Sequence, residues 1–183
     1  MSLIPFHIQN QSLQDRRVTV LGLGRFGGGI AVTRFLAERG AQITVLDNLS
    51  ASELEQSLQQ LADIHGIRYL LEEKTRELPA TDLLVLNPAI PPQHPLLAQA
   101  EREQIPVTSE IELFWQLNPA PVVGVTGSNG KSTTTAMIHS VFSESGSTCW
   151  LGGNIGVSLL PQVEQIQPTD WVILELSSFQ LHG

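Results

Sequence analysis

The sequence predicts an α/β fold, with a parallel-sheet domain over residues 1–118 followed by a smaller α/β domain over residues 122–183. Short apolar runs alternate with amphipathic stretches, which is typical of parallel sheets covered by helices. Two glycine-rich loops each stand between an apolar run and a helical stretch. The segment Asn118-Pro119-Ala120-Pro121 interrupts this alternation, because proline lacks a backbone donor and disfavours helix at the residue before it. We therefore place the domain boundary there.

Five strands are expected in the first domain, each rich in Val, Ile or Leu because strands of a parallel sheet are buried on both faces. They cover residues 18–23, 42–46, 67–70, 83–86 and 105–107. Helices are expected between them, with apolar faces that recur at helical spacing. Two of these faces are formed by Val32, Phe35 and Leu36 and by Leu54, Leu58 and Leu61. A further helix covers residues 96–103, and Ser109 with Glu112 forms a capping box for the last one.

Three strands are expected in the second domain, over residues 122–126, 148–151 and 171–174, with a helix after the first. The core-facing stripe of that helix is assigned to Met137, Ile138, Val141 and Phe142. Three strands are few for an open sheet flanked by helices, so we expect this domain to be cut short.

Composition argues against several classes of function. The net charge is −8 with only ten Lys and Arg, so no nucleic-acid-binding surface is expected. The sequence has no apolar run long enough for a membrane span, and its N-terminus lacks the features of a signal peptide. The single cysteine, Cys149, allows no internal disulfide. These features together favour a cytoplasmic protein that contacts no membrane.

The strongest motif is a glycine-rich loop followed by lysine and hydroxyl residues. It reads Gly127, Ser128, Asn129, Gly130, Lys131, Ser132 and Thr133, with Thr134 next. Placed between a strand and a helix, such a P-loop offers backbone N–H groups and a helix N-terminus to phosphate. The Lys131 ammonium can neutralise the β and γ phosphates, and the Ser132 hydroxyl can bind Mg²⁺. We predict that these residues bind ATP, although Val125 stands where the pattern usually has glycine.

A carboxylate at the end of the last apolar run supports the same site. Glu175 follows Trp171-Val172-Ile173-Leu174, and P-loop enzymes commonly hold Mg²⁺ or its water from this position. We predict Ser132 and Glu175 as metal ligands, and Lys131 and Glu175 as the catalytic residues.

A second phosphate-binding pattern follows the first expected strand. Gly22-Leu23-Gly24-Arg25-Phe26-Gly27 is a G-x-G-x-x-G fingerprint, and Asp47 ends the next strand twenty residues after Gly27. The pattern makes the first domain Rossmann-like. Its chemistry is a pyrophosphate at a helix N-terminus and a carboxylate facing a ribose or base, so a UDP ligand satisfies it as well as NAD does.

Several segments together resemble the Mur ligase family. The ATP loop of that family is similar to residues 125–133 here, and three further segments match its D-glutamate-adding branch. They are Gly152-Gly153-Asn154-Ile155-Gly156, Glu175-Leu176-Ser177-Ser178-Phe179-Gln180-Leu181 and Glu110-Ile111-Glu112-Leu113-Phe114. The resemblance implies an ATP-dependent amide ligase of peptidoglycan precursor synthesis, which joins D-glutamate to UDP-N-acetylmuramoyl-L-alanine through an acyl phosphate.

The resemblance also implies roles for single residues. Gly24, Arg25 and Phe26 would contact the pyrophosphate, Asp47 the uridine and Asn154 the UDP substrate, with ATP and Mg²⁺ at the second loop. Asn87-Pro88-Ala89 stands where the family commonly has S-P-G. The family's third domain, which holds D-glutamate, has no counterpart in these 183 residues, so we expect the chain alone to be inactive as a ligase.

Two other functions fit parts of the sequence. A nucleotide-binding module without catalytic activity would keep both loops and agrees with the short length. An NAD-dependent oxidoreductase would use the first fingerprint but would leave Lys131, Ser132 and Glu175 without a role.

Overall fold

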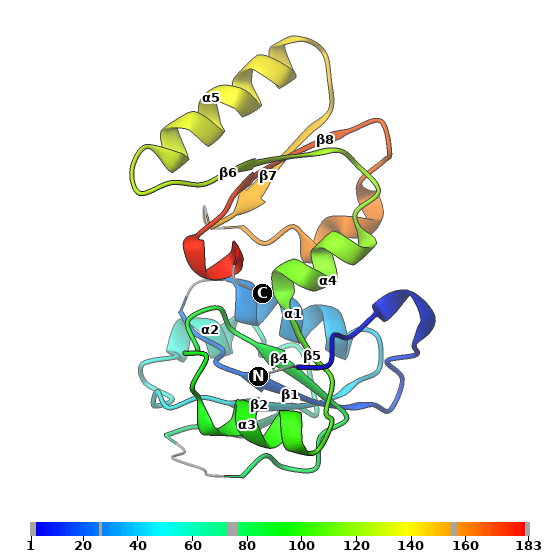
Figure 1. The fold of residues 1–183 in the computed structure, drawn as a ribbon, viewed down its shortest axis with the longest axis vertical. Helices are drawn as coiled ribbons and strands as arrows, with labels where there is room; N and C mark the ends of the chain where they lie inside the picture. The colour runs from blue at the N-terminus through cyan, green and yellow to red at the C-terminus, as the bar shows by residue number, and fades with distance from the viewer. Residues whose placement is uncertain (1–2, 26, 73–76, 155–156, 182–183) are drawn as a thin grey trace.

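The computed structural model describes residues 3–25, 27–72, 77–154 and 157–181, and it contains two parallel sheets flanked by helices (Figure 1). The first sheet lies in the lower half of Figure 1 and the second in the upper half. The first unit comprises η1 (Ile8–Asn10), β1 (Arg17–Leu21), α1 (Gly28–Ala37), β2 (Gln42–Leu46), α2 (Glu55–Gln59), β3 (Arg68–Leu70), β4 (Leu83–Leu86), α3 (Pro95–Arg102), β5 (Val107–Ser109) and α4 (Glu110–Leu117). The second comprises β6 (Val122–Val125), α5 (Lys131–Glu144), β7 (Cys149–Gly153), η2 (Leu160–Gln165), β8 (Trp171–Glu175) and η3 (Ser178–Leu181).

The first sheet has the strand order β3-β2-β1-β4-β5, with every pair parallel. The strands β1, β2, β4 and β5 are largely buried, as the sequence predicts. The prediction of two-sided burial is wrong for β3, which lies at the edge of the sheet and has one exposed and two partly buried residues. Val18 and Val20 belong to the core cluster under α1 and α4, whereas Leu21 and Leu84 belong to the cluster under α3. The strand order reverses between β1 and β4, and ligands of open α/β sheets bind at the carboxyl ends of the strands at such a point.

The predicted elements are confirmed with small shifts of their ends. The first strand ends at Leu21 instead of residue 23, because Gly22 adopts a φ of 85° and turns the chain. The final strand of this sheet covers Val107–Ser109 instead of residues 105–107, so the two ranges share only Val107. Ser109 Oγ accepts a hydrogen bond from the Glu112 backbone N–H at 3.3 Å, so the Ser109 half of the predicted capping box is present.

The second sheet has the order β6-β8-β7, again parallel, and α5 packs on it. The predicted core-facing stripe of α5 is wrong at two of its four positions. Ile138 and Phe142 are partly buried, and the Phe142 ring lies 4.7 Å from that of Trp171. Met137 and Val141 are 64% and 66% exposed. A helix turns by about 100° per residue, so the positions just before 138 and 142 face away from this narrow sheet.

The two sheets share one hydrophobic core. A single cluster of buried side chains includes Phe35 of α1, Phe114 of α4, Leu160 of η2 and Val172 of β8. The helix η2 packs against both α1 and α4, so the second unit rests on the helical layer of the first. The boundary at residues 118–122 stays a prediction. No helix within the described residues is long and apolar enough to cross a lipid bilayer.

Candidate nucleotide sites at the carboxyl ends of two sheets

The loop after β6 has the backbone of an open anion-binding turn. Gly127 and Gly130 adopt φ values of 145° and 75°, a region that side chains with a Cβ rarely enter. The helix α5 starts at Lys131, and the residues 126–130 are exposed. The helix N-terminus and the N–H groups of the loop therefore face a region that a phosphate group can enter.

Lys131, Ser132 and Glu175 meet at the mouth of this loop. The Lys131 ammonium donates to the Gly127 carbonyl at 2.9 Å, so the lysine lies along the loop. Ser132 Oγ donates to Glu175 Oε2 at 2.7 Å. Glu175 is only 3% exposed, and it ends the central strand β8 between Val125 and Gly153. The structure thus brings together the four residues 127, 131, 132 and 175 of the predicted ATP and metal site.

Asn154 joins this cluster through Glu175. Its side-chain Nδ2 donates to Glu175 Oε1 at 3.1 Å, and its backbone N–H donates to the Glu175 carbonyl at 2.8 Å. The close approach requires glycine at the preceding position, because a Cβ on Gly153 would lie 2.2 Å from the Glu175 carbonyl oxygen. The structure places the Asn154 side chain beside Glu175 at the second loop. Its contact with the UDP substrate stays a prediction.

The first fingerprint loop is held from two sides by neighbouring elements. Asp47, which is 7% exposed, accepts from the Gly24 N–H at 3.1 Å and from the Leu49 N–H at 2.9 Å. Ser57 Oγ of α2 donates to the Gly24 carbonyl at 2.8 Å. The Asp47 carboxylate therefore fixes the glycine loop in addition to any role toward a ligand. Phe26 lies outside the described residues.

The loop after β4 packs against the fingerprint loop through Asn87. A Cβ on Gly22 would lie 2.9 Å from Asn87 Cβ, and one on Gly24 would lie 2.9 Å from Asn87 Nδ2. Glycine at both positions therefore allows Asn87 to pack against the loop. Asn87 Oδ1 also accepts from the Ala89 N–H at 3.0 Å, which forms a local turn. Ala89 needs no left-handed backbone, because the described non-glycine residues with positive φ are Asp15, Glu72 and Gln104.

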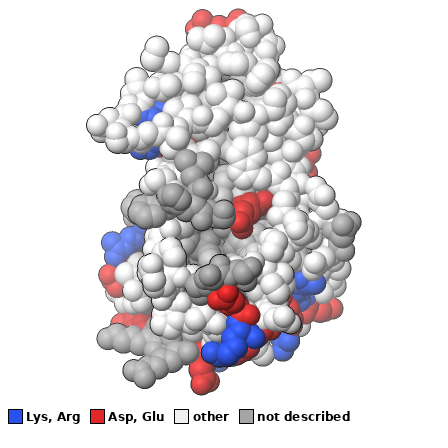
Figure 2. Space-filling view, viewed as in Figure 1, with Lys and Arg blue, Asp and Glu red and all other residues white. Residues whose placement is uncertain are grey.

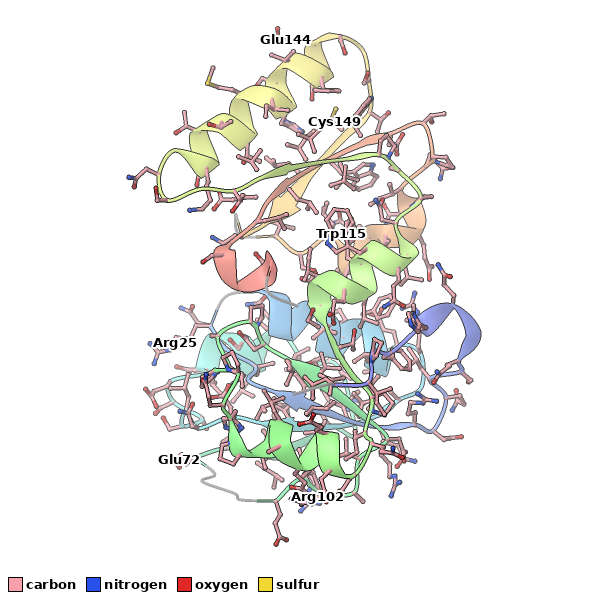
Figure 3. The ribbon with its side chains drawn as sticks, viewed as in Figure 1. Arg25, Glu72, Arg102, Trp115, Glu144 and Cys149 are labelled. Carbon is pink, nitrogen blue, oxygen red and sulfur yellow. The ribbon has the colours of Figure 1, made fainter. Side chains whose placement is uncertain are left out.

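Arg25 extends from the first loop toward the turn before α2 (Figure 3). Its guanidinium pairs with Glu53 at 2.9 Å, and both side chains are about half exposed. Hydrogen bonds from Ser50 lower the pKa of Glu53, with a smaller contribution from Arg25. Sequence reasoning missed Glu53 and Ser57. The spacing of Ser50 and Glu53, a capping-box pattern, was the signal available for Glu53.

A partly buried carboxyl group links the two units. Glu110 begins α4 and accepts a hydrogen bond from Ser158 Oγ, which lies just before η2. Desolvation by burial raises the pKa of Glu110 above its ordinary value of 4.5, and the Ser158 hydrogen bond opposes this effect. Figure 2 shows acidic side chains at the waist of the molecule over α4, whose first turn carries Glu110 and Glu112.

We expect Glu110→Gln to make stability less sensitive to pH above about 4.5. A carboxyl group whose pKa is raised by folding stabilises the protein below its ordinary pKa, and this contribution is lost as the pH rises through the raised value. Glutamine stays neutral and can still accept from Ser158. Urea unfolding at a series of pH values measures the effect, with Glu112→Gln as the control for removing one charge from the same turn.

Two carboxylates paired with arginine titrate below this window. Arg34 and Arg17 lower the pKa of Asp63 and Asp82 to about 2, so their contribution is present above their ordinary 3.8 and is lost as the pH falls. Parallel stability curves for wild type and Glu110→Gln between pH 4.5 and neutrality would contradict the assignment to Glu110.

The fold and its loops define a class: an α/β protein with a Rossmann-like sheet and a P-loop sheet in tandem. Residues 16–109 match the model of the Mur ligase MurD-like N-terminal domain, and residues 125–183 match that of the Mur ligase middle domain. The chain belongs to the Mur ligase family.

Curated relatives agree with this assignment. The chain is 40% identical over 173 residues to the UDP-N-acetylmuramoylalanine–D-glutamate ligase of Acetivibrio thermocellus, covering 94% of this chain and 36% of the relative. The enzyme of the same name from Geobacillus sp. is 39% identical over 177 residues, covering 96% and 38%. The chain thus spans little more than a third of these relatives. The solved UDP-N-acetylmuramate-alanine ligase MurC of Thermotoga maritima shares the fold, with a TM-score of 0.51 and 22% identity over 88% of this chain and 37% of that chain.

Proposed function

We propose that this chain is the nucleotide-binding part of an ATP-dependent ligase that adds D-glutamate to UDP-N-acetylmuramoyl-L-alanine in peptidoglycan precursor synthesis. The observation that carries the proposal is the convergence of Lys131, Ser132 and Glu175 at the P-loop. The names of the curated relatives support the choice of substrates. ATP and UDP-linked precursors are cytoplasmic compounds, so the proposal includes a cytoplasmic setting.

The residues of the second loop fit ATP with Mg²⁺. The glycines and the start of α5 would bind phosphate oxygens, and Lys131 would move from the Gly127 carbonyl to the β and γ phosphates. Ser132 and Glu175 supply the hard oxygen ligands that Mg²⁺ prefers. Bound Mg²⁺ would neutralise charge on the phosphates. Among the described residues no group of three His, Cys, Asp or Glu could hold a metal. Phosphate and water oxygens can supply further ligands to Mg²⁺.

The reaction needs ATP because a carboxylate expels hydroxide poorly. Transfer of the γ-phosphoryl group of ATP to the carboxylate of the muramoyl-alanine substrate gives an acyl phosphate and releases ADP. The amine of D-glutamate then attacks the acyl carbon and displaces phosphate. The P-loop residues would hold the transferring phosphoryl group, and Lys131 would stabilise its charge. Gly24 and Arg25 would hold the diphosphate of the UDP substrate and Asp47 the uridine, at the switch point of the first sheet.

Ligand titrations of the 183-residue chain test the binding part of this proposal. We expect UDP to bind the first site and ATP with Mg²⁺ the second, both saturably by calorimetry. Saturable NAD binding without a response to UDP would favour the oxidoreductase instead.

Phosphate release by the full-length enzyme tests the reaction. It should require UDP-N-acetylmuramoyl-L-alanine, ATP, Mg²⁺ and D-glutamate together, and the 183-residue chain alone should release none. Full-length protein that binds both nucleotides but releases no phosphate would favour a non-catalytic nucleotide-binding module.

A further inference from the structure

Arg25 lies beside a small cavity next to the fingerprint loop. The cavity measures about 210 Å³ and is lined by Arg25, Ser52, Glu53, Glu55, Gln56 and Ser57. Ser57 binds the Gly24 carbonyl, so the wall that carries Glu53 is fastened directly to the loop. An anion bound at this loop would therefore lie close to both Arg25 and Glu53.

Among the residues that the structure describes, Arg25 is the basic side chain in a loop that follows the carboxyl end of a strand in the first sheet. The other described arginines of this unit lie elsewhere: just before or at the start of a strand, on a helix, or in the turn after α1, and several are already paired with acidic groups. Arg17 pairs with Asp82, and Arg34 pairs with Asp63. A diphosphate at the first loop thus depends on Arg25 for positive charge within the part of the unit that the structure describes.

The partner of Arg25 is fixed independently of it. Glu53 Oε1 accepts from Arg25, whereas Glu53 Oε2 accepts from the Ser50 N–H and from Ser50 Oγ, each at 3.0 Å. The Glu53 N–H in turn donates to Ser50 Oγ at 3.3 Å. This reciprocal cap holds the carboxylate in place when Arg25 leaves, and the same hydrogen bonds keep it ionised.

We propose that Glu53 is a specificity-determining residue of the first site, which occupies Arg25 as an internal anion until a ligand with a diphosphate displaces it. The inference rests on the proposed function in that the diphosphate belongs to the UDP substrate. A singly charged anion gains little from Arg25, because Glu53 already pairs with the guanidinium charge. A diphosphate that the loop N–H groups also bind has enough charge to compete. Glu53 therefore lowers the affinity of the first site for anions in general, so that a ligand occupies the site only if it carries a diphosphate.

Calorimetric titration of UDP, inorganic pyrophosphate and uridine into wild-type chain and Glu53→Gln tests this inference. Glutamine keeps an acceptor for Ser50 but removes the competing charge. We expect UDP and pyrophosphate to bind roughly two- to fivefold more tightly, the range for exposed ion pairs, and uridine to bind as in wild type. Arg25→Gln should weaken UDP binding, and the gain from Glu53→Gln should vanish in the double variant.

Glu55→Gln is the matched control. Glu55 lines the same cavity but accepts from Gln59 Nε2 at 3.4 Å, so this variant removes an equal charge without touching the pair. Melting temperatures confirm that each variant is folded.

Three outcomes of the UDP titrations would overturn the inference. The first is weaker UDP binding in Glu53→Gln, which would mean that Glu53 supports Arg25. The second is an equal gain in UDP affinity in Glu53→Gln and Glu55→Gln. The third is a gain in UDP affinity that persists in the double variant without Arg25. If wild type binds no UDP, the proposed function fails separately, and pyrophosphate then decides the inference. Absence of pyrophosphate binding in every variant would also reject it.

Discussion

Glu175→Gln is expected to abolish most of the effect of Mg²⁺ on ATP affinity while leaving the chain folded. The carboxylate is buried and accepts from Ser132 Oγ and Asn154 Nδ2. Glutamine can still accept from Ser132, and rotation of the Asn154 amide can restore the other hydrogen bond. A neutral amide is a much poorer ligand for a hard cation. We expect the ratio of ATP affinities with and without Mg²⁺ to fall roughly 10- to 100-fold, as for other changes at metal sites.

ATP titrations with Mg²⁺ and with a chelator measure this ratio. Asp170→Asn is the matched control, because Asp170 is a buried carboxylate just before the other end of β8 and accepts from Trp150 Nε1 at 2.9 Å. That variant should lower the melting temperature without changing the Mg²⁺ effect. An unchanged Mg²⁺ effect in folded Glu175→Gln would remove Glu175 from the proposed metal site.

Lys131→Ala is expected to weaken ATP binding by roughly 10- to 100-fold, the range for a hydrogen bond to a charged group. The ammonium donates to the Gly127 carbonyl of its own loop, so its loss removes one contact at the surface and no part of the core. We expect unfolding free energy to change by less than about 0.5 kcal/mol, as for most surface substitutions.

Calorimetry and thermal unfolding measure the two effects separately. Met137→Ala on the exposed face of α5 is the control, since it truncates a side chain of the same helix away from the loop. Unchanged ATP affinity, or a chain that no longer folds, would show that Lys131 has a structural role instead.

The sequence alone predicted the strands and both glycine loops. The strands β1, β2 and β4 are short and mostly apolar, because burial on both faces leaves few positions for polar residues. The loops were visible because the left-handed angles at Gly22, Gly24, Gly127 and Gly130 favour glycine. The Mur ligase family could also be inferred from the sequence, because the residues that characterise its loops are contiguous along the chain.

The apolar face of α5 shows the limit of predicting burial from hydrophobic spacing. Four apolar residues at helical spacing predicted one buried stripe, but Met137 and Val141 are exposed. Hydrophobic spacing identifies a helix and its apolar side without giving the width of the surface that covers it. That width depends on how many strands lie beneath the helix, which is a property of the sheet.

The tertiary structure alone decided which distant residues meet. Asn154 reaches Glu175, Asp47 holds the Gly24 loop, and Glu53 pairs with Arg25. These partners are separated by 21 to 28 residues, and they meet because parallel pairing places the carboxyl ends of separate strands at one edge. Local sequence patterns reflect the burial and backbone angles of single segments. The order of strands in a sheet depends on the free energy of the whole core, so the polar contacts at its edge become known only with the fold.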